Sequence, residues 1–421
     1  MKTPICDFIE EYIKSEPNRL HMPAHKGKAI IGFEKYDITE LSGADSLYTA
    51  NGIIKQSEEN SSRLFGCDSF YSAEGSSLCI RAMLYLLKSY GITRFISARN
   101  SHSAFLSACA LCDISMQELE ETLSSCKEPS AVYITSPDYL GNIADIGAIS
   151  ELCKKYGALL CVDCAHGAYL KFLPESLYPT DLGADICCSS AHKTLPVLTG
   201  GAYLHLSGSL DSFFRENAKR ALMLFGSTSP SYLILQSLDK ANLYIENEFK
   251  STLSEFVKEV ECAKETLSAL GYTLCGNEPL KITVYAKDYG YYGTELADIL
   301  ESKSIYPEFA DRDFLVLMLS PIDRNSLSAL VSALSGIERK CALNEPAPKI
   351  ERAGLALTPR ESVFAKSERI SVSRSVGRIL SQPTVSCPPA VPIAVCGEVI
   401  TENAKKCFEY YGIEEIYTVK E

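Results

Sequence analysis

The chain has 421 residues, of which 46% are hydrophobic and 22% charged, and its formal net charge is −12 at pH 7. This length is too great for one compact core and predicts a large domain with one or two smaller ones. The acidic balance repels phosphate backbones and anionic lipid, and no long run of Lys or Arg reverses it locally, so nucleic acid is excluded as an expected partner.

The first 50 residues are turn-rich and irregular, and we expect residues 1–50 to form an amino-terminal segment. The stretch MKTPICDFIEEYIKSE carries carboxylates and no apolar core, which argues against a secretion signal. No apolar run along the chain approaches the roughly 20 residues that a membrane helix needs. We therefore expect a cytoplasmic protein with no membrane partner.

Residues 51–277 are predicted to form the large domain, because short β-rich runs alternate there with helical stretches, as in a parallel α/β sheet. One repeating unit is clear. Residues 131–137 predict a strand, and residues 144–157 predict a helix with Asp145 as its N-cap. The next strand, 157–163, is nearly all apolar, as expected for a strand covered on both faces.

Further elements follow in the second half of the chain. Strands are expected at 184–190 and 201–206, and a long amphipathic helix from about 230 to 270. A small α/β domain (278–342) is predicted with its strand, helix and strand at 279–288, 295–304 and 313–321. The carboxyl-terminal domain is predicted to span 343–421. Its first part lies in a stretch rich in Pro and charge (342–354) that resembles a linker.

The seventeen cysteines predict neither disulfides nor a metal site. Several lie in apolar strand-like runs, where a free Cys acts as a small hydrophobe, and a reducing cytosol disfavours disulfides. Cys109 and Cys112, like Cys161 and Cys164, have the CxxC spacing. Neither pair has a second pair at zinc-finger distance, so no metal site is expected.

Polar residues follow several of the predicted strands, where open parallel sheets bind their ligands. Asp163 ends one strand, Lys193 lies just past the next, and His102 follows a short apolar run. The Gly75–Ser77 turn opens a predicted helix. Its N–H groups, its hydroxyls and the positive end of the helix dipole suit a phosphate.

These parts match the needs of pyridoxal 5'-phosphate (PLP). Its aldehyde requires a lysine, and its pyridine nitrogen needs a carboxylate to stay protonated, so that the ring accepts electrons. The phosphate needs an anion cradle, and the flat ring needs a stacking partner. Lys193, Asp163, Gly75–Ser77 and His102 supply one each. Taken singly, Lys193 could equally be a surface lysine and Asp163 a helix cap.

Several motifs occur in order along the chain: HMPAHKGK, DITELSGADSLY, VDCAHGA, SSAHKTLP followed by LTGGAYLH, and STSPSYLILQSLD. Over almost the whole chain they resemble the Orn/Lys/Arg decarboxylase family of PLP enzymes, and most of all its compact arginine decarboxylase-like type. The resemblance implies the aspartate-aminotransferase-like fold (fold type I). This is an α/β class with a PLP-binding large domain, a mainly parallel sheet and smaller α+β carboxyl-terminal domains.

The resemblance also implies roles for individual residues. Lys193 would carry PLP as a Schiff base, Asp163 would pair with the pyridine nitrogen, and His102 would stack on the ring. The rest of the cofactor pocket would be formed by Gly75, Ser76, Ser77, Ala165, Ser190 and His192. In this family the STSPSY loop reaches the cofactor of the neighbouring subunit. Ser227, Thr228 and Ser229 would do so here, in a homodimer or an assembly of dimers.

The histidines divide by position, since five of the six, His21, His25, His102, His166 and His192, lie in the segments assigned to the site. His166 and released Lys193 are alternative acids for protonating the substrate Cα. His21 and His25 either bind a metal or, as we favour, line the entrance to the site. His205 lies in a strand-like run and is expected to be structural.

Three further residues keep two interpretations each. Asp45 either meets the distal cation of the substrate or, as we favour, caps a turn. Arg378 and Glu398 either reach the substrate or fix the carboxyl-terminal domain, and we slightly favour the second role. The turn Cys387–Pro392 departs from the family's usual YPPGIP, a change that bears on the substrate pocket and leaves the cofactor site untouched.

The expected reaction is α-decarboxylation of a basic amino acid, with arginine favoured over lysine or ornithine, giving CO2 and a polyamine precursor. One alternative is another fold-type I PLP reaction, such as transamination or lyase chemistry. A second is a catalytically weak regulatory homologue, against which the intact Lys193 and Asp163 argue.

Overall fold

The computed structural model describes residues 1–98, 100–114, 116–118, 129–387 and 391–420. They fall into two compact units. The first comprises Met1–Arg94, Thr122–Tyr133 and Asp145–Thr252, and the second comprises Phe95–Glu121, Ile134–Ala144 and Leu253–Glu421. The four-part domain division drawn from the sequence stays a prediction.

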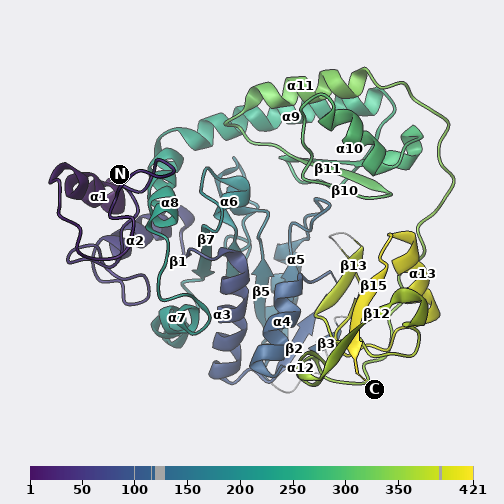
Figure 1. The fold of residues 1–421 in the computed structure, drawn as a ribbon, viewed down its shortest axis with the longest axis horizontal. Helices are drawn as coiled ribbons and strands as arrows, with labels where there is room; N and C mark the ends of the chain where they lie inside the picture. The colour runs from purple at the N-terminus through teal and green to yellow at the C-terminus, as the bar shows by residue number, and fades with distance from the viewer. Residues whose placement is uncertain (99, 115, 119–128, 388–390, 421) are drawn as a thin grey trace. The chain divides into compact units, whose positions relative to one another are not determined.

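The first unit combines helices with a β-sheet (Figure 1). Its helices are α1 (Pro4–Lys14), α2 (Ile53–Phe65), α3 (Gly75–Tyr90), α5 (Ile146–Lys155), η3 (Ala168–Phe172), α6 (Ala191–Thr194), α7 (Ser212–Phe225), α8 (Tyr232–Tyr244) and η4 (Ile245–Phe249). Its strands are β1 (Asp68–Ser72), β5 (Leu159–Asp163), β6 (Ile186–Ser189), β7 (Ala202–Leu206) and, up to Tyr133, β4 (Ser130–Thr135). They lie in the order β1-β7-β6-β5-β4.

The sheet register brings two predicted site strands to a common edge. β5 and β6 are parallel, with Asp163 opposite Cys188. β7 runs antiparallel to β6 and to β1. Because parallel strands end at the same edge, the residues that follow β5 and β6 lie close together.

The predicted strand–helix–strand unit is confirmed, and its local chemistry explains the boundaries. The Asp145 side chain accepts the Ala148 N–H at 3.0 Å and so caps α5. Gly157 lies past the helix end with φ +68°, a conformation that glycine adopts without strain. α5 then packs on β5, while α3 packs on β6 and β7.

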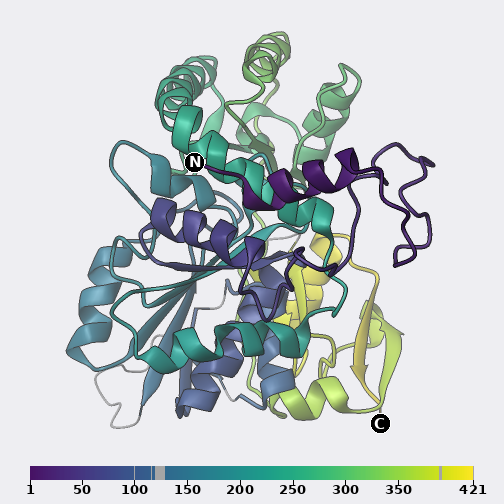
Figure 2. The ribbon, with the colours of Figure 1, turned by 90° about the vertical axis from the view of Figure 1, so that its left-hand side faces the viewer.

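The amino-terminal helix α1 is anchored by a buried carboxylate in α8. Asp239 accepts the backbone N–H groups of Ile5 at 3.0 Å and Cys6 at 3.1 Å. Its other oxygen accepts the Ser57 hydroxyl at 2.6 Å. Figure 2 shows α1 in dark purple, with the irregular segment that follows it.

The second unit carries the remaining elements. Its helices are α4 (Ser103–Cys112), α9 (Lys250–Ala269), η5 (Ala286–Tyr289), α10 (Gly293–Glu301), α11 (Arg324–Ser335), α12 (Pro359–Phe364), η6 (Val372–Arg374) and α13 (Glu402–Tyr410). Its strands are β2 (Arg94–Ser97), β3 (Met116–Glu118), β8 (Thr273–Cys275), β9 (Lys281–Tyr285), β10 (Phe309–Ala310), β11 (Phe314–Met318), β12 (Ser367–Ser371), β13 (Thr384–Cys387), β14 (Val391–Val395) and β15 (Glu415–Val419).

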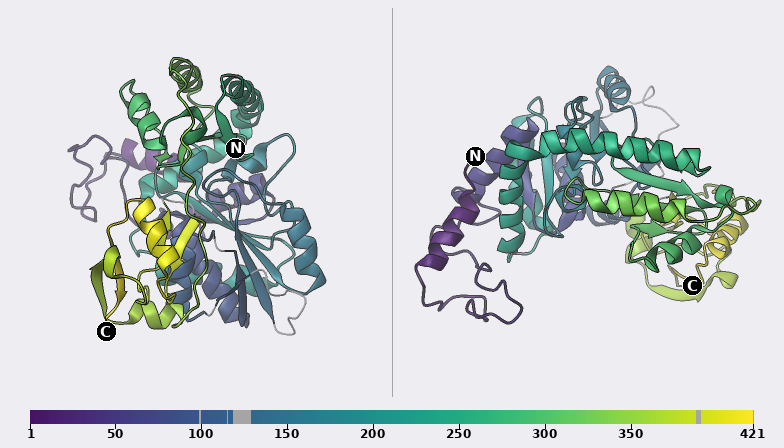
Figure 3. Two further views of the ribbon diagram at one scale, coloured as in Figure 1. Left: turned by 90° about the vertical axis from the view of Figure 1, so that its right-hand side faces the viewer. Right: turned by 90° about the horizontal axis from the view of Figure 1, so that it is seen from above.

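The predicted small-domain strands form part of a four-stranded antiparallel sheet, in the order β10-β11-β9-β8. Helices α9, α10 and α11 lie over one face of it (Figure 3). Arg324 joins α11 to α9 through Glu255 at 3.0 Å and Glu259 at 2.8 Å. The helix expected from about 230 to 270 is present as α8 and α9, joined by the π-helical turn η4.

The carboxyl-terminal part has a core of its own. β12 pairs with β15 and β13 with β14, and apolar side chains from these strands and α13 form one buried cluster around Leu380, Ile393 and Phe408. Within the described ranges, no helix combines the length and apolar character needed to cross a membrane.

Candidate active site

The turn between β1 and α3 forms one wall of the candidate site. The Gly75 N–H donates to the Gly200 carbonyl at 2.7 Å, which ties the start of α3 to the turn before β7. Gly75 has φ +73°, and a Cβ added there would meet no described heavy atom within 4 Å. Open space therefore lies beside the first turn of α3, where N–H groups have no intrahelical acceptor.

The end of β6 supplies a second wall. Ser190 is the N-cap position of α6, and its hydroxyl donates to Ser76 Oγ at 2.8 Å. His192 Nδ1 lies 3.0 Å from the Gly201 carbonyl oxygen. Because a carbonyl only accepts, Nδ1 carries the hydrogen in this arrangement. Two hydroxyls from distant sequence positions thus meet at a helix N-terminus.

Lys193, on α6, supplies the amine of this site. Its Nζ lies 3.0 Å from Nε2 of His166, which follows β5. His166 is buried and Lys193 is half-buried. The amine and the imidazole are within hydrogen-bond distance, so a proton can pass between them.

Asp163 supplies the negative charge, and its side chain is only 1% exposed. Oδ1 accepts the Ala165 N–H at 3.1 Å and the Cys188 thiol at 3.7 Å. Oδ2 accepts the Tyr133 hydroxyl at 3.2 Å. Burial and then the Asp163 charge raise the pKa of Cys188 well above its usual value, so this thiol stays protonated and donates.

The structure therefore brings most of the predicted residues together within the first unit. These are Gly75, Ser76, Asp163, Ala165, His166, Ser190, His192 and Lys193. Ser77 follows Ser76 in the first turn of α3. His102 lies in the second unit, where its Nδ1 accepts the Ala104 N–H at 3.1 Å and caps α4.

The STSPSY loop is exposed on the first unit at Ser227, Thr228 and Ser229. The Ser227 N–H donates to Glu74 Oε1 at 2.5 Å, and the Ser229 N–H donates to Ser227 Oγ at 3.1 Å. Glu74 is the N-cap position of α3, so the loop lies beside the start of the predicted phosphate-binding helix of its own chain.

The turn-capping role favoured for Asp45 is confirmed, and the contacts described for Arg378 and Glu398 agree with a role in fixing the carboxyl-terminal domain, which stays a prediction. Asp45 accepts backbone N–H groups at the start of α2, including Gly52 at 2.8 Å and Ile54 at 3.0 Å. Burial alone would raise the pKa of Asp45, but these hydrogen bonds together lower it below its ordinary value. Arg378 pairs with Glu368 at 2.7 Å, and Glu398 accepts the Val395 N–H at 2.9 Å.

His205 is also structural, since it is fully buried against the rings of Phe65, Tyr178 and Tyr203. Its Nδ1 pairs with the Ser69 hydroxyl at 2.9 Å. Burial, with a smaller effect of Lys171, lowers its pKa to about 3.

The two loop histidines contact side chains of the first unit. His21 Nε2 pairs with the Tyr12 hydroxyl at 2.6 Å, and His25 Nε2 lies 3.2 Å from Asp37. Across the described residues, no group of three or more His, Cys, Asp or Glu is placed to hold a metal ion. In the predicted turn Cys387–Pro392, residues 388–390 lie outside the described residues.

Tyr133 and Cys188 are site residues that the sequence did not reveal. Both lie inside apolar strands, where tyrosine and cysteine are typical core residues. Register supplies the missing information, because it places Cys188 opposite Asp163 on paired strands. The hydroxyl of a tyrosine on β4 reaches the same carboxylate.

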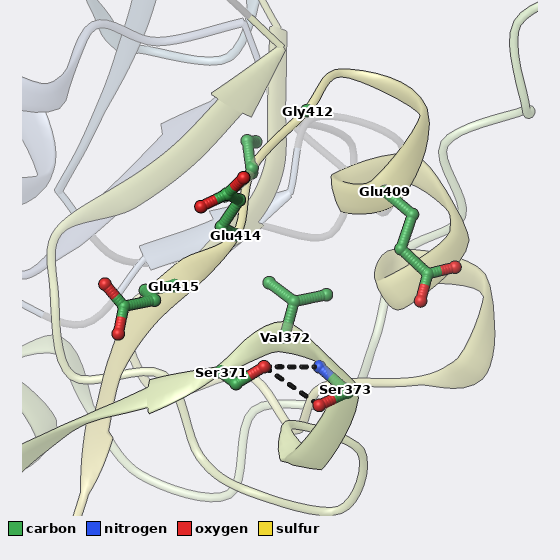
Figure 4. A pocket seen from close by; sticks show the side chains of 8 residues that line it. Ser371, Val372, Ser373, Glu409, Gly412, Glu414 and Glu415 are labelled. Carbon is green, nitrogen blue, oxygen red and sulfur yellow. Dashed lines mark hydrogen bonds between the residues drawn. The ribbon is translucent and has the colours of Figure 1, made fainter.

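Two surface hollows lie in the second unit, and neither contains a residue of this site. One of about 590 Å³ is lined by Glu409, Glu414, Glu415 and the Ser371–Ser373 turn (Figure 4). The Ser371 Oγ there accepts the Ser373 N–H at 3.3 Å. The other, of about 400 Å³, is lined by tyrosines around Arg312.

The donor set at β5, β6 and α3 fits PLP. A lysine amine, a buried carboxylate, and two hydroxyls beside the open space at a helix N-terminus are the groups that an aldehyde, a pyridine nitrogen and a phosphate require.

Comparison with known proteins agrees with this reading. Residues 113–283 match the family model described as "Orn/Lys/Arg decarboxylase, major domain". The chain is 28% identical over 453 residues to the uncharacterized protein YaaO of Bacillus subtilis (strain 168), covering 96% of this chain and 93% of that one. It is 27% identical over 455 residues to the arginine decarboxylase of the same organism, covering 96% and 92%.

Solved structures show the fold. Lysine decarboxylase A from Pseudomonas aeruginosa superposes with a TM-score of 0.79 at 16% identity, covering 99% of this chain and 80% of that one. Serine palmitoyltransferase from Sphingomonas wittichii gives a TM-score of 0.59 at 14% identity, covering 80% and 83%. The expected α/β fold of the fold type I PLP enzymes, with its mainly parallel sheet, is confirmed.

Proposed function

We propose that this chain, a relative of the Orn/Lys/Arg decarboxylases, is a PLP-dependent enzyme that removes the α-carboxylate of a basic amino acid. The observation that carries the proposal is the placement of Lys193, His166 and Asp163 beyond parallel strands, beside the Ser76–Ser190 pair. Near-full-length similarity to arginine decarboxylases favours arginine as substrate, ahead of lysine or ornithine.

Each residue of the site would hold one part of PLP. Lys193 would bind its aldehyde carbon and Asp163 its ring nitrogen. The first turn of α3, with Ser76, Ser77, Ser190 and His192, would hold the phosphate. His102 would stack on the ring. When bound, PLP supplies an electron sink for the electron pair left behind as CO2 departs.

The protein's own task is then to hold charge and move one proton. Asp163 holds its carboxyl group in a buried position, where few water molecules compete for its hydrogen bonds. His166 and Lys193 lie 3.0 Å apart, so either can hold the proton that must reach the substrate Cα.

We further propose that the protein works in the cytoplasm as a homodimer or an assembly of dimers. Several large apolar side chains are exposed in the amino-terminal segment: Leu20, Met22, Ile30, Ile31 and Phe33. Exposed apolar groups of this size favour burial against another chain. The exposed Ser227–Ser229 loop would then reach the cofactor of the neighbouring subunit.

The test is release of CO2 from arginine, lysine and ornithine by purified protein supplied with PLP. The proposal expects CO2 and the matching amine from one of the three, and none from the Lys193→Ala variant. Transfer of the amino group to an added oxo acid, without CO2, would indicate an aminotransferase. A protein that binds PLP and turns over none of these substrates would point to a regulatory homologue.

A further inference from the structure

The Asp163 carboxylate is surrounded by hydrogen-bond donors from its own chain. A carboxylate has about four lone-pair sites for hydrogen bonds. Three are occupied in this chain, by the Ala165 N–H, the Cys188 thiol and the Tyr133 hydroxyl. Among the described residues these donors leave room for one more, which is the number that a single ring N–H of PLP requires.

Tyr133 is the side chain whose hydroxyl has no evident packing role. It is 2% exposed within β4, where a phenylalanine would fill the same volume. A buried hydroxyl is costly unless it is hydrogen-bonded, and this one donates to Asp163 Oδ2 at 3.2 Å. The hydroxyl therefore serves the carboxylate.

We propose that Tyr133 is a positioning residue, whose hydroxyl orients the Asp163 carboxylate toward the ring nitrogen of PLP. This inference rests on the proposed function, because it concerns the same cofactor site.

The physical reason is the competition between Asp163 and the ring nitrogen for one proton. Hydrogen bonds donated to a carboxylate favour its ionised form, and they therefore leave the proton on the nitrogen. Without the Tyr133 hydroxyl, the carboxylate holds the protonated ring nitrogen less well, and the ring becomes a poorer electron acceptor. Cys188 cannot compensate, because a thiol at 3.7 Å is a weak donor and bonds the other oxygen.

The experiment compares the affinities for PLP and for 1-deaza-PLP, an analogue with carbon in place of the ring nitrogen. Dissociation constants are measured by absorbance and fluorescence for wild type, Tyr133→Phe and Asp163→Asn. Wild type should prefer PLP, and Asp163→Asn should lose that preference. Tyr133→Phe should reduce the preference about tenfold, the effect of removing one hydrogen bond to a charged group.

Tyr203→Phe is the matched control. It deletes the hydroxyl of another buried tyrosine of the same sheet, on β7, and it should leave the preference for PLP unchanged. In Tyr133→Phe, affinity for the analogue should stay at the wild-type value, which also reports an intact fold. With the preferred substrate, kcat should fall while KM is retained.

The outcomes separate this inference from the proposal beneath it. If wild type binds no PLP, the proposed function itself is wrong. If wild type prefers PLP and Tyr133→Phe keeps the full preference, only the positioning role is wrong. Equal losses of affinity for PLP and for the analogue would also overturn it, because they would mean that the hydroxyl serves only the fold.

Discussion

Lys193 Nζ lies 3.0 Å from His166 Nε2, so the lysine of the candidate site is in contact with an imidazole from the neighbouring strand end. An amine that binds an aldehyde must first lose its proton, and the imidazole lies close enough to accept it. This contact links two residues 27 positions apart in sequence.

Replacing His166 with Gln removes that proton acceptor while retaining a polar side chain. We expect kcat to fall by about 100-fold, within the range for loss of a general acid or base. The absorbance of bound PLP should persist. Unchanged turnover would assign the proton transfer to Lys193 alone. The measurement is steady-state CO2 release beside a visible spectrum of each protein.

Shared active sites predict complementation between two defective variants. Lys193→Ala lacks the cofactor lysine, and a triple variant at Ser227, Thr228 and Ser229, each changed to Ala, lacks the loop hydroxyls. A mixed dimer would contain one intact site of two. Random reassociation of equal amounts should therefore restore about one quarter of wild-type activity in a symmetric dimer.

The control for this mixing experiment is light scattering, which must show that the variants exchange subunits. If mixed dimers form and activity stays at the level of the separate variants, the loop acts within its own chain. Dilution of wild type below the dimer's dissociation constant should likewise release PLP, because part of the phosphate shell is then lost.

His205 predicts a loss of stability in mild acid. Burial lowers the pKa of His205 in the folded chain to about 3 from its ordinary value of 6.5, so between these values the unfolded chain binds a proton that the folded chain excludes. Stability is therefore full above about pH 6.5 and falls as pH drops toward 3, by up to about 1.4 kcal/mol per pH unit.

His205→Phe keeps a ring among Phe65, Tyr178 and Tyr203 and removes the titrating group. The fall in melting temperature between pH 7.5 and pH 5 should be smaller in this variant than in wild type. The melting temperatures are followed by near-UV circular dichroism. An equal fall in melting temperature in both proteins would mean that His205 titrates normally or that other groups dominate the pH dependence.

Much of the fold could be predicted from local pattern. The strand ending at Asp163, the helix capped by Asp145 and the strand of Ile186–Ser189 follow from apolar runs bounded by turn and cap residues. Helix α3 likewise begins at Gly75, as its turn predicts. These features depend on neighbours in sequence, which a single chain displays.

Other features depend on which strands pair and could not be read from one sequence. Tyr133 lies in a strand buried along its length, so the sequence does not reveal that its hydroxyl donates to Asp163. The contact of Ser190 with Ser76 joins residues 114 positions apart. The π-helical turn η4 interrupts the long predicted helix, and the hydrophobic periodicity of the sequence does not predict it.

The most direct test of the account is to locate PLP on the chain. The protein is saturated with PLP, reduced with borohydride to fix any lysine–cofactor bond, digested and analysed by mass spectrometry. The account predicts one major phosphopyridoxyl peptide, modified at Lys193, and the loss of that modification in Lys193→Ala. A modification centred on another lysine, or none at saturating PLP, would contradict it.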